Sequence, residues 1–140
     1  MEYRRFDDYI VVRMDKGDGV IRSLTKVLDK EDVQLAKISG IGATDNVRIG
    51  FFDEKSKNYN VKRYTESFEI TSIQGNASRK DGEVYTHLHI SLASKDNKMI
   101  GGHLDACIIS VTGEFIIDII KGDANRKMSE EIGINLIDFD

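Results

Sequence analysis

The stretch VYTHLHISLASKDNKMIGGHLDACI, residues 84–108, decides the fold. Apolar and polar side chains alternate through its first half, and a second alternation follows at once, so each half predicts a β-strand. Placing the apolar residues of both halves on one face requires even positions to oppose even ones. A three-residue loop at 95–97, with Asn97 in its left-handed position, does this. The stretch therefore predicts an antiparallel hairpin with three facing pairs, namely Leu88 with Leu104, His89 with His103, and His87 with Asp105.

Outward from this hairpin, the chain predicts further strands and a single main helix. Apolar residues recur at helical spacing over about 18–30, with Asp18 placed to cap the first turn. Separate runs rich in β-forming residues predict strands around 9–12, 33–38, 47–51, 68–73 and 115–120. We expect an α+β fold, an antiparallel β-sheet with one principal helix packed on it, in one domain spanning 1–140, with a short helical turn near 129–132.

Composition excludes several classes of protein. The chain has 140 residues and 20 Lys and Arg against 24 Asp and Glu, a net charge of −4, so the charge balance gives no reason to bind a nucleic-acid backbone. Direct binding of DNA is not expected. The single cysteine, Cys107, cannot close an intramolecular disulfide, which fits a reducing, cytoplasmic setting. No signal peptide or membrane-spanning segment is expected, because no apolar run is long enough.

All three histidines of the chain lie in the predicted hairpin. His87 and His89 are two residues apart and share a face, and the register brings His103 opposite His89. Opposed Cβ atoms lie about 4.5 to 5.5 Å apart, so three neutral imidazoles can converge on zinc, nickel or copper. We therefore predict a site for zinc or another divalent transition metal at these histidines. The alternative is that they only occupy a polar sheet face.

Four further residues are candidates for supporting roles at this site. Asp105 could orient a histidine or serve as a fourth ligand. Glu69 or Asp105 could act as a base, although the alternation of Glu69 with its apolar neighbours favours an ordinary residue on the polar face of a strand. Gly101 and Gly102 remove side chains beside His103. That gap either lets a small molecule, an anion or another subunit approach the backbone, or marks a bulge or bend of the sheet.

The motifs of common enzyme classes are missing from the sequence. It has no HExxH, no GxSxG, no P-loop and no complete GxGxxG. A three-histidine zinc with an open position could still activate water, so a metal-dependent hydrolase or lyase acting on a small molecule is the alternative function. A non-enzymatic binding module is favoured over that alternative.

Several short motifs, taken in order, resemble one known family. They are RMDKGD at 13–18, SGIGA at 39–43, FEI at 68–70, QGN at 74–76, HLH at 87–89 and GGHL at 101–104. Over about residues 5–139 the chain resembles the PPC domain, the plants and prokaryotes conserved domain. In plants this domain is joined to AT-hook motifs, which need an Arg-Gly-Arg-Pro core. The chain has no proline and resembles the standalone prokaryotic type.

The resemblance implies a compact α/β domain that assembles as a homotrimer. It also implies that some prokaryotic members carry a metal on the histidines matched here by His87, His89 and His103. Prokaryotic relatives are often called DNA-binding proteins through the plant fusions, but a shared fold does not carry that function over. We therefore expect a standalone, homotrimeric, zinc-like three-histidine module of regulatory or unknown role in the cytoplasm.

Overall fold

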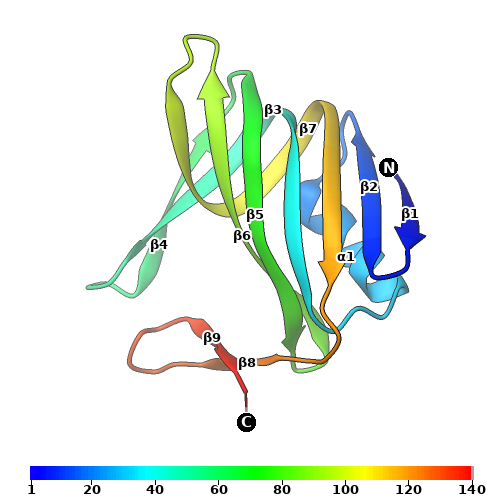
Figure 1. Ribbon diagram of the computed structural model, residues 1–140. Coiled ribbons are helices and arrows are strands. Elements are labelled where there is room, and N and C mark those ends of the chain that lie inside the picture. The colour runs from blue at the N-terminus through cyan, green and yellow to red at the C-terminus, as the bar shows by residue number, and fades with distance from the viewer. Residues whose placement is uncertain (140) are drawn as a thin grey trace.

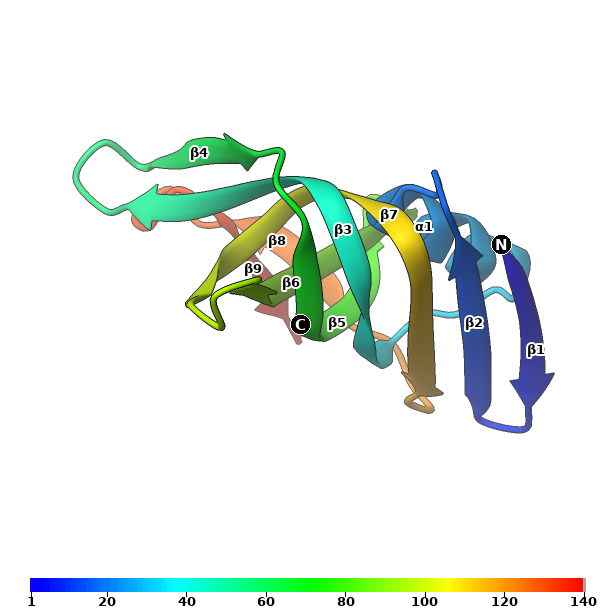
Figure 2. The same cartoon turned by 90° about the horizontal axis from the view of Figure 1, so that it is seen from above.

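The computed structural model describes residues 1–139 and contains one large antiparallel sheet, one helix and a small separate hairpin (Figures 1 and 2). In chain order its elements are β1 (Glu2–Phe6), β2 (Tyr9–Asp15), α1 (Val20–Lys30), β3 (Ala36–Asp53), β4 (Asn58–Tyr64), β5 (Phe68–Lys80), β6 (Glu83–Ser94), β7 (Met99–Ile119), β8 (Asn125–Met128) and β9 (Asn135–Asp138). The α+β class with one principal helix is confirmed.

The large sheet curls until two of its strands meet. Its order is β1-β2-β7-β6-β5-β3-β4, and β7 pairs with β3 as well. β3, β5, β6 and β7 therefore form a closed ring of pairings. The start of β7 pairs with β6, whereas its later part lies between β3 and β2. Closure covers most edges of these four strands, and residues 83–88 of β6 pair only with β5.

Helix α1 packs against β6 and β7 through one apolar face. Its buried side chains include Val20, Leu24 and Val27, which repeat at the predicted helical spacing. The predicted cap is wrong, because Gly19 occupies the N-cap position and makes no side-chain bond there. The Asp18 carboxylate instead accepts the Asp15 backbone N–H at 2.8 Å and ties the preceding turn. Among the described residues, no helix is long and apolar enough to cross a membrane.

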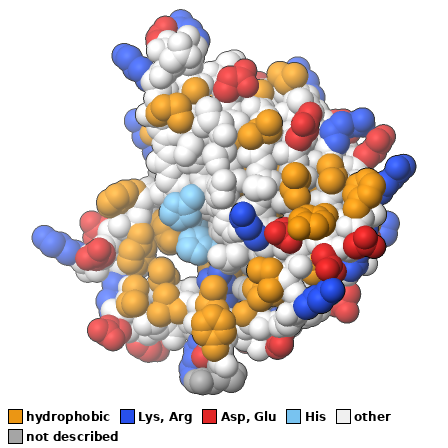
Figure 3. Space-filling view, in the orientation of Figure 1, with side chains coloured by type: hydrophobic (Ala, Val, Ile, Leu, Met, Phe, Trp, Pro, Cys, Tyr) orange, Lys and Arg blue, Asp and Glu red, His pale blue; other side chains and the backbone are white. Residues whose placement is uncertain are grey.

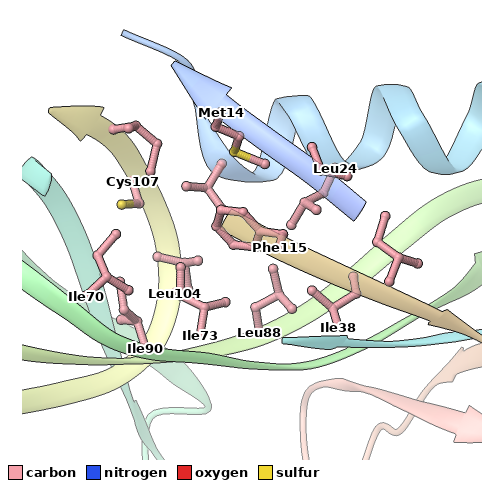
Figure 4. Packing of buried hydrophobic residues seen from close by; sticks show 14 of the residues in the cluster. Met14, Leu24, Ile38, Ile70, Ile73, Leu88, Ile90, Leu104, Cys107 and Phe115 are labelled. Carbon is pink, nitrogen blue, oxygen red and sulfur yellow. The ribbon is translucent and has the colours of Figure 1, made fainter. Parts of the chain in front are cut away.

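The core lies between α1 and the curled sheet. Figure 4 shows Phe115 at its centre, with Met14 and Leu24 on one side and Leu88 and Ile38 on the other. All five side chains are fully or almost fully buried. Cys107 is also buried, as its apolar neighbours predict, and burial raises the pKa of its thiol to about 11, so this cysteine is an inert packing residue.

Two strands are much longer than the sequence predicts. The runs expected at 33–38 and 47–51 belong largely to the single strand β3, and the runs at 100–108 and 115–120 merge into β7. Register shifts between Gly42 and Ile49 let β3 bend without ending. Thr44 sits at these shifts and donates its hydroxyl to the Ile108 carbonyl at 2.7 Å. Polar residues that, in the sequence, are typical of strand ends therefore lie inside long, bent strands.

The C-terminal hairpin of β8 and β9 is not anticipated from the sequence. The expected helical turn at 129–132 lies in the connection between these strands, where the Gly133 N–H donates to the Ser129 carbonyl at 2.6 Å. The hairpin contacts β5 through β8, and it lies below the large sheet in Figure 1.

Candidate metal centre

The histidine hairpin has the register that the sequence predicts. His89 of β6 lies directly opposite His103 of β7. The loop turns at Lys95–Asn97, where Asn97 is left-handed with φ 56° and the Ser94 N–H donates to the Lys98 carbonyl at 2.9 Å. The β6–β7 ladder ends at the histidine pair, because β7 continues along β3 with Leu104 opposite Ile49. The predicted pairs of Leu88 with Leu104 and of His87 with Asp105 are therefore wrong, because β7 has left β6 at these positions.

The three imidazoles form one cluster. Their ring centroids lie 5.4 Å (His87 to His89), 5.3 Å (His87 to His103) and 5.6 Å (His89 to His103) apart. Each offers a nitrogen to a set whose members all lie within 4.8 Å of one another. Two nitrogens bound to one zinc ion are at most about 4.2 Å apart. Small rotations of the side chains would therefore bring the three nitrogens close enough to bind one ion. In Figure 3 the imidazoles reach the surface together beside a hollow.

The surroundings of His87 and His103 favour the neutral form of these two imidazoles. Burial is the main cause that lowers the pKa of His87, and the charges of His103, Arg126 and His89 act in the same direction. Burial also lowers the pKa of His103, with help from His89 and against the opposing effect of Asp105. Only a neutral imidazole can bind a metal ion, so both shifts favour ligation near neutral pH.

His103 carries the clearest sign of a missing partner. Its Nδ1 is buried without a hydrogen-bond partner, and across residues 1–139 only one other buried side-chain polar atom, Oδ1 of Asn135, shares that condition. Tyr59 covers the same imidazole at a centroid distance of 4.5 Å. Gly50, which pairs with His103, makes room for this ring, since a Cβ there would lie 2.9 Å from Tyr59 Cδ1. Three imidazoles are a donor set that a divalent metal ion accepts, and the unpartnered nitrogen of His103 is consistent with such an ion.

The other predicted site residues lie outside this cluster. Asp105 is exposed and pairs with Arg48 at 2.9 Å, and it is not part of the metal-binding group. Glu69 lines a different groove. A Cβ on Gly101 would lie 2.5 Å from the Ile90 carbonyl oxygen, and one on Gly102 would lie 2.8 Å from Ile49. The two glycines thus allow close packing between strands of the chain itself.

Comparison with known proteins identifies the family to which this chain belongs. The family model of the Plants and Prokaryotes Conserved (PCC) domain, also written PPC, matches residues 1–121. The chain belongs to this family. Among curated proteins no match is found.

Several solved structures agree closely with the chain. One from Bacteroides thetaiotaomicron, called a "putative dna binding protein", is 28% identical with a TM-score of 0.95 and covers 99% of this chain and 96% of its own. The plant- and prokaryote-conserved protein of Pyrococcus horikoshii is 31% identical (TM-score 0.86, coverage 98% and 93%). A metal-containing protein of Archaeoglobus fulgidus is 30% identical (TM-score 0.86, coverage 97% and 96%). The resemblance drawn from the short motifs is confirmed.

Beyond the residues matched by the PPC model, β8 brings Arg126 against the histidine cluster. Its guanidinium donates to Asn76 Oδ1 at 2.7 Å, to Ser78 Oγ at 2.9 Å and to the Asn135 carbonyl at 3.2 Å. Asn76 lies opposite His87 in the β5–β6 ladder, so the hydrogen bond holds the charge beside that imidazole. The positions of Arg126, Tyr59 and Asn135 near the histidines could not be predicted from the sequence, because no spacing links these residues to the histidines.

Proposed function

We propose that this protein binds a divalent transition-metal ion of the zinc type through His87, His89 and His103, as a non-enzymatic, homotrimeric module. The observation that carries the proposal is the cluster of three imidazoles in which a buried nitrogen of His103 lacks a partner. The metal-containing relative from Archaeoglobus fulgidus supports it. A bound zinc ion would supply a Lewis acid that keeps a position for water or another ligand.

The direct test is metal analysis of protein purified without a histidine tag. We expect about one zinc ion per chain after dialysis against buffer with trace zinc, because three imidazoles are a sufficient protein ligand set for this ion. Equilibrium dialysis with nickel and copper then ranks the metals. A protein that retains none of the three contradicts the proposal.

The hydrolase or lyase alternative needs a base beside the metal. Among the described residues, no free carboxylate lies in the histidine cluster to act as that base. Asp105 is paired with Arg48, and Glu69 lies along another groove with Glu114. A binding or regulatory role therefore fits these residues better than hydrolysis.

Metal affinity should fall as the solution becomes acidic. A histidine that is protonated cannot bind the ion, and the lowered pKa values of His87 and His103 place that competition below their usual value of about 6.5. We expect nearly constant zinc affinity from pH 8 to 7, then a loss that approaches about tenfold per pH unit for each histidine involved. Competition titration with a chelator across this range measures it. An affinity that is the same at pH 5 and pH 8 would contradict histidine ligation.

The homotrimer is proposed on the basis of family membership and an exposed apolar face. Val11 of β2, Ile41 of β3, and Val111 and Ile116 of β7 line neighbouring grooves and are between 44% and 69% exposed. Contiguous apolar surface of this kind is typical of an interface between subunits. We assign this face to contact with further copies of the chain.

Light scattering at micromolar concentration tests this assembly. We expect a mass three times that of the 15.8 kDa chain, and a shift toward the single-chain mass in Ile41→Asp, because a carboxylate cannot be buried in an apolar interface without large cost. Met99→Asp, which changes an exposed residue at the tip of the β6–β7 hairpin, is the matched control and should stay trimeric. A single-chain mass for the unmodified protein would refute the trimer.

Direct recognition of DNA is not part of the proposal. The net charge of −4 and the lack of an AT-hook predict no sequence-selective, submicromolar binding to duplex DNA at physiological salt. Fluorescence anisotropy with random and A·T-rich duplexes, repeated at two salt concentrations, measures this. Selective binding by the untagged protein would establish the DNA-binding name for this chain.

A further inference from the structure

Beside the histidines lies a cavity that the metal proposal leaves unused. It measures about 240 Å³, the liquid volume of roughly eight water molecules. Residues from the β3–β4 hairpin form one wall, and the C-terminal β8–β9 hairpin forms another. His87 and His103 lie in its lining, so anything bound there contacts the edge of the histidine cluster. The hollow beside the imidazoles is visible in Figure 3.

The lining of this cavity contains a cationic side chain, Lys57, and no carboxylate among the described residues. The Lys57 ammonium donates to the Glu130 backbone carbonyl at 2.7 Å and forms no ion pair with a described residue. Behind the Tyr85 wall, Arg126 is only 7% exposed and also has only neutral acceptors. Lys57 is exposed, whereas the Arg126 guanidinium is held out of water without an anion. Positive charge of this kind beside a hollow attracts an anion.

The remaining walls are suited to an apolar body. Phe52, Tyr59 and Tyr85 line the cavity with Ile134. Phe52 and Tyr59 contact each other at a centroid distance of 5.2 Å, and the Arg126 guanidinium lies 4.6 Å from the Tyr85 ring centroid, so neighbouring groups hold these rings in place. A small inorganic anion would leave most of this aromatic surface uncovered.

Both buried side-chain polar atoms without a partner lie in residues that line this one cavity. They are His103 Nδ1 and Asn135 Oδ1, and residues 1–139 contain no others. Buried polar atoms are normally paired, so two exceptions at one place indicate partners from outside the chain. The metal would account for the imidazole nitrogen. Asn135 Oδ1 can only accept a hydrogen bond, so its partner is a donor, such as a water molecule bound with the ligand, and not the carboxylate itself.

We infer that the cavity binds a small organic carboxylate with an apolar or aromatic body, its carboxylate directed to the metal and Lys57. The inference rests on the proposed metal site, and it names the class of ligand that this site takes. Arg126 contributes charge through the wall and holds the β8–β9 hairpin in place. The hairpin thereby serves as the specificity element of the site.

Isothermal titration of the zinc-loaded, untagged protein tests this inference with phenylacetate, its neutral counterpart phenylacetamide, and inorganic phosphate. We expect phenylacetate to bind at least tenfold more tightly than either of the others, since only it matches both the charge and the aromatic walls. Lys57→Gln should weaken phenylacetate binding about tenfold and leave the zinc content unchanged, because it removes one charged hydrogen-bond partner. Lys55→Gln, an exposed lysine of the same turn outside the lining, is the control and should bind as the unmodified protein does.

Zinc content, measured on every sample, distinguishes the two proposals. If zinc is bound but phenylacetate binds no more tightly than phenylacetamide, the carboxylate site is wrong and the metal site stands. Tighter binding of phosphate would likewise overturn the aromatic-carboxylate assignment. If the protein holds no metal, both proposals fall.

Discussion

Replacing His87 and His89 together by alanine should abolish zinc binding while leaving the fold intact. The two residues supply two of the three imidazoles, and the remaining His103 cannot hold the ion alone. Even residues that only orient metal ligands change affinity by about 10- to 100-fold, so we expect a loss greater than 100-fold. Competition with a chromogenic chelator gives the affinity, and elemental analysis gives the stoichiometry.

The fold should tolerate this double change, because His89 is exposed and His87 is only half-buried. Ser91→Ala is the matched control, since Ser91 lies two residues further along β6 on the same side as His89. Circular dichroism confirms that all variants are folded. An unchanged zinc stoichiometry in the double variant would mean that these residues are ordinary histidines of a sheet face.

Gly75→Ala should be among the most destabilising single changes in the protein. A Cβ at this position would overlap the His87 carbonyl oxygen and lie 2.9 Å from Leu88 Cα, and neither backbone atom can rotate away. The strands β5 and β6 would have to separate where Gly75 faces Leu88. We expect the free energy of unfolding to fall by about 1 to 3 kcal/mol. We also expect weaker zinc binding, because the backbone that carries His87 moves.

Urea denaturation of the metal-free protein measures the stability change, and chelator competition measures the zinc affinity. Gly19→Ala is the control, because its added Cβ would meet only ordinary contacts at 3.7 and 3.8 Å and should cost less than about 1 kcal/mol at this N-cap. Equal stability of Gly75→Ala and the unmodified protein would contradict the close approach of β5 and β6.

The sequence was sufficient to predict the hairpin and the cluster of three histidines. Side-chain alternation with a period of two assigns faces, and the left-handed Asn97 fixes the loop length, so the pairing of His89 with His103 follows from residues close in sequence. Helix α1 is equally local, because its buried residues repeat at helical spacing. Each of these features depends on patterns within one short stretch of chain.

The surroundings of the cluster were decided by tertiary structure. After His103, β7 no longer pairs with β6 and continues along β3. This change of partner depends on closure of the sheet, which no local sequence pattern encodes. The ion pair of Arg48 with Asp105 follows from that pairing and draws Asp105 away from the metal group. Tyr59 and Arg126 reach the histidines from strands 28 and 39 positions from His87 in the sequence. Contacts over such separations are set by packing of the whole chain. Periodicity therefore predicts the three clustered histidines, and only the folded protein shows the cavity beside them.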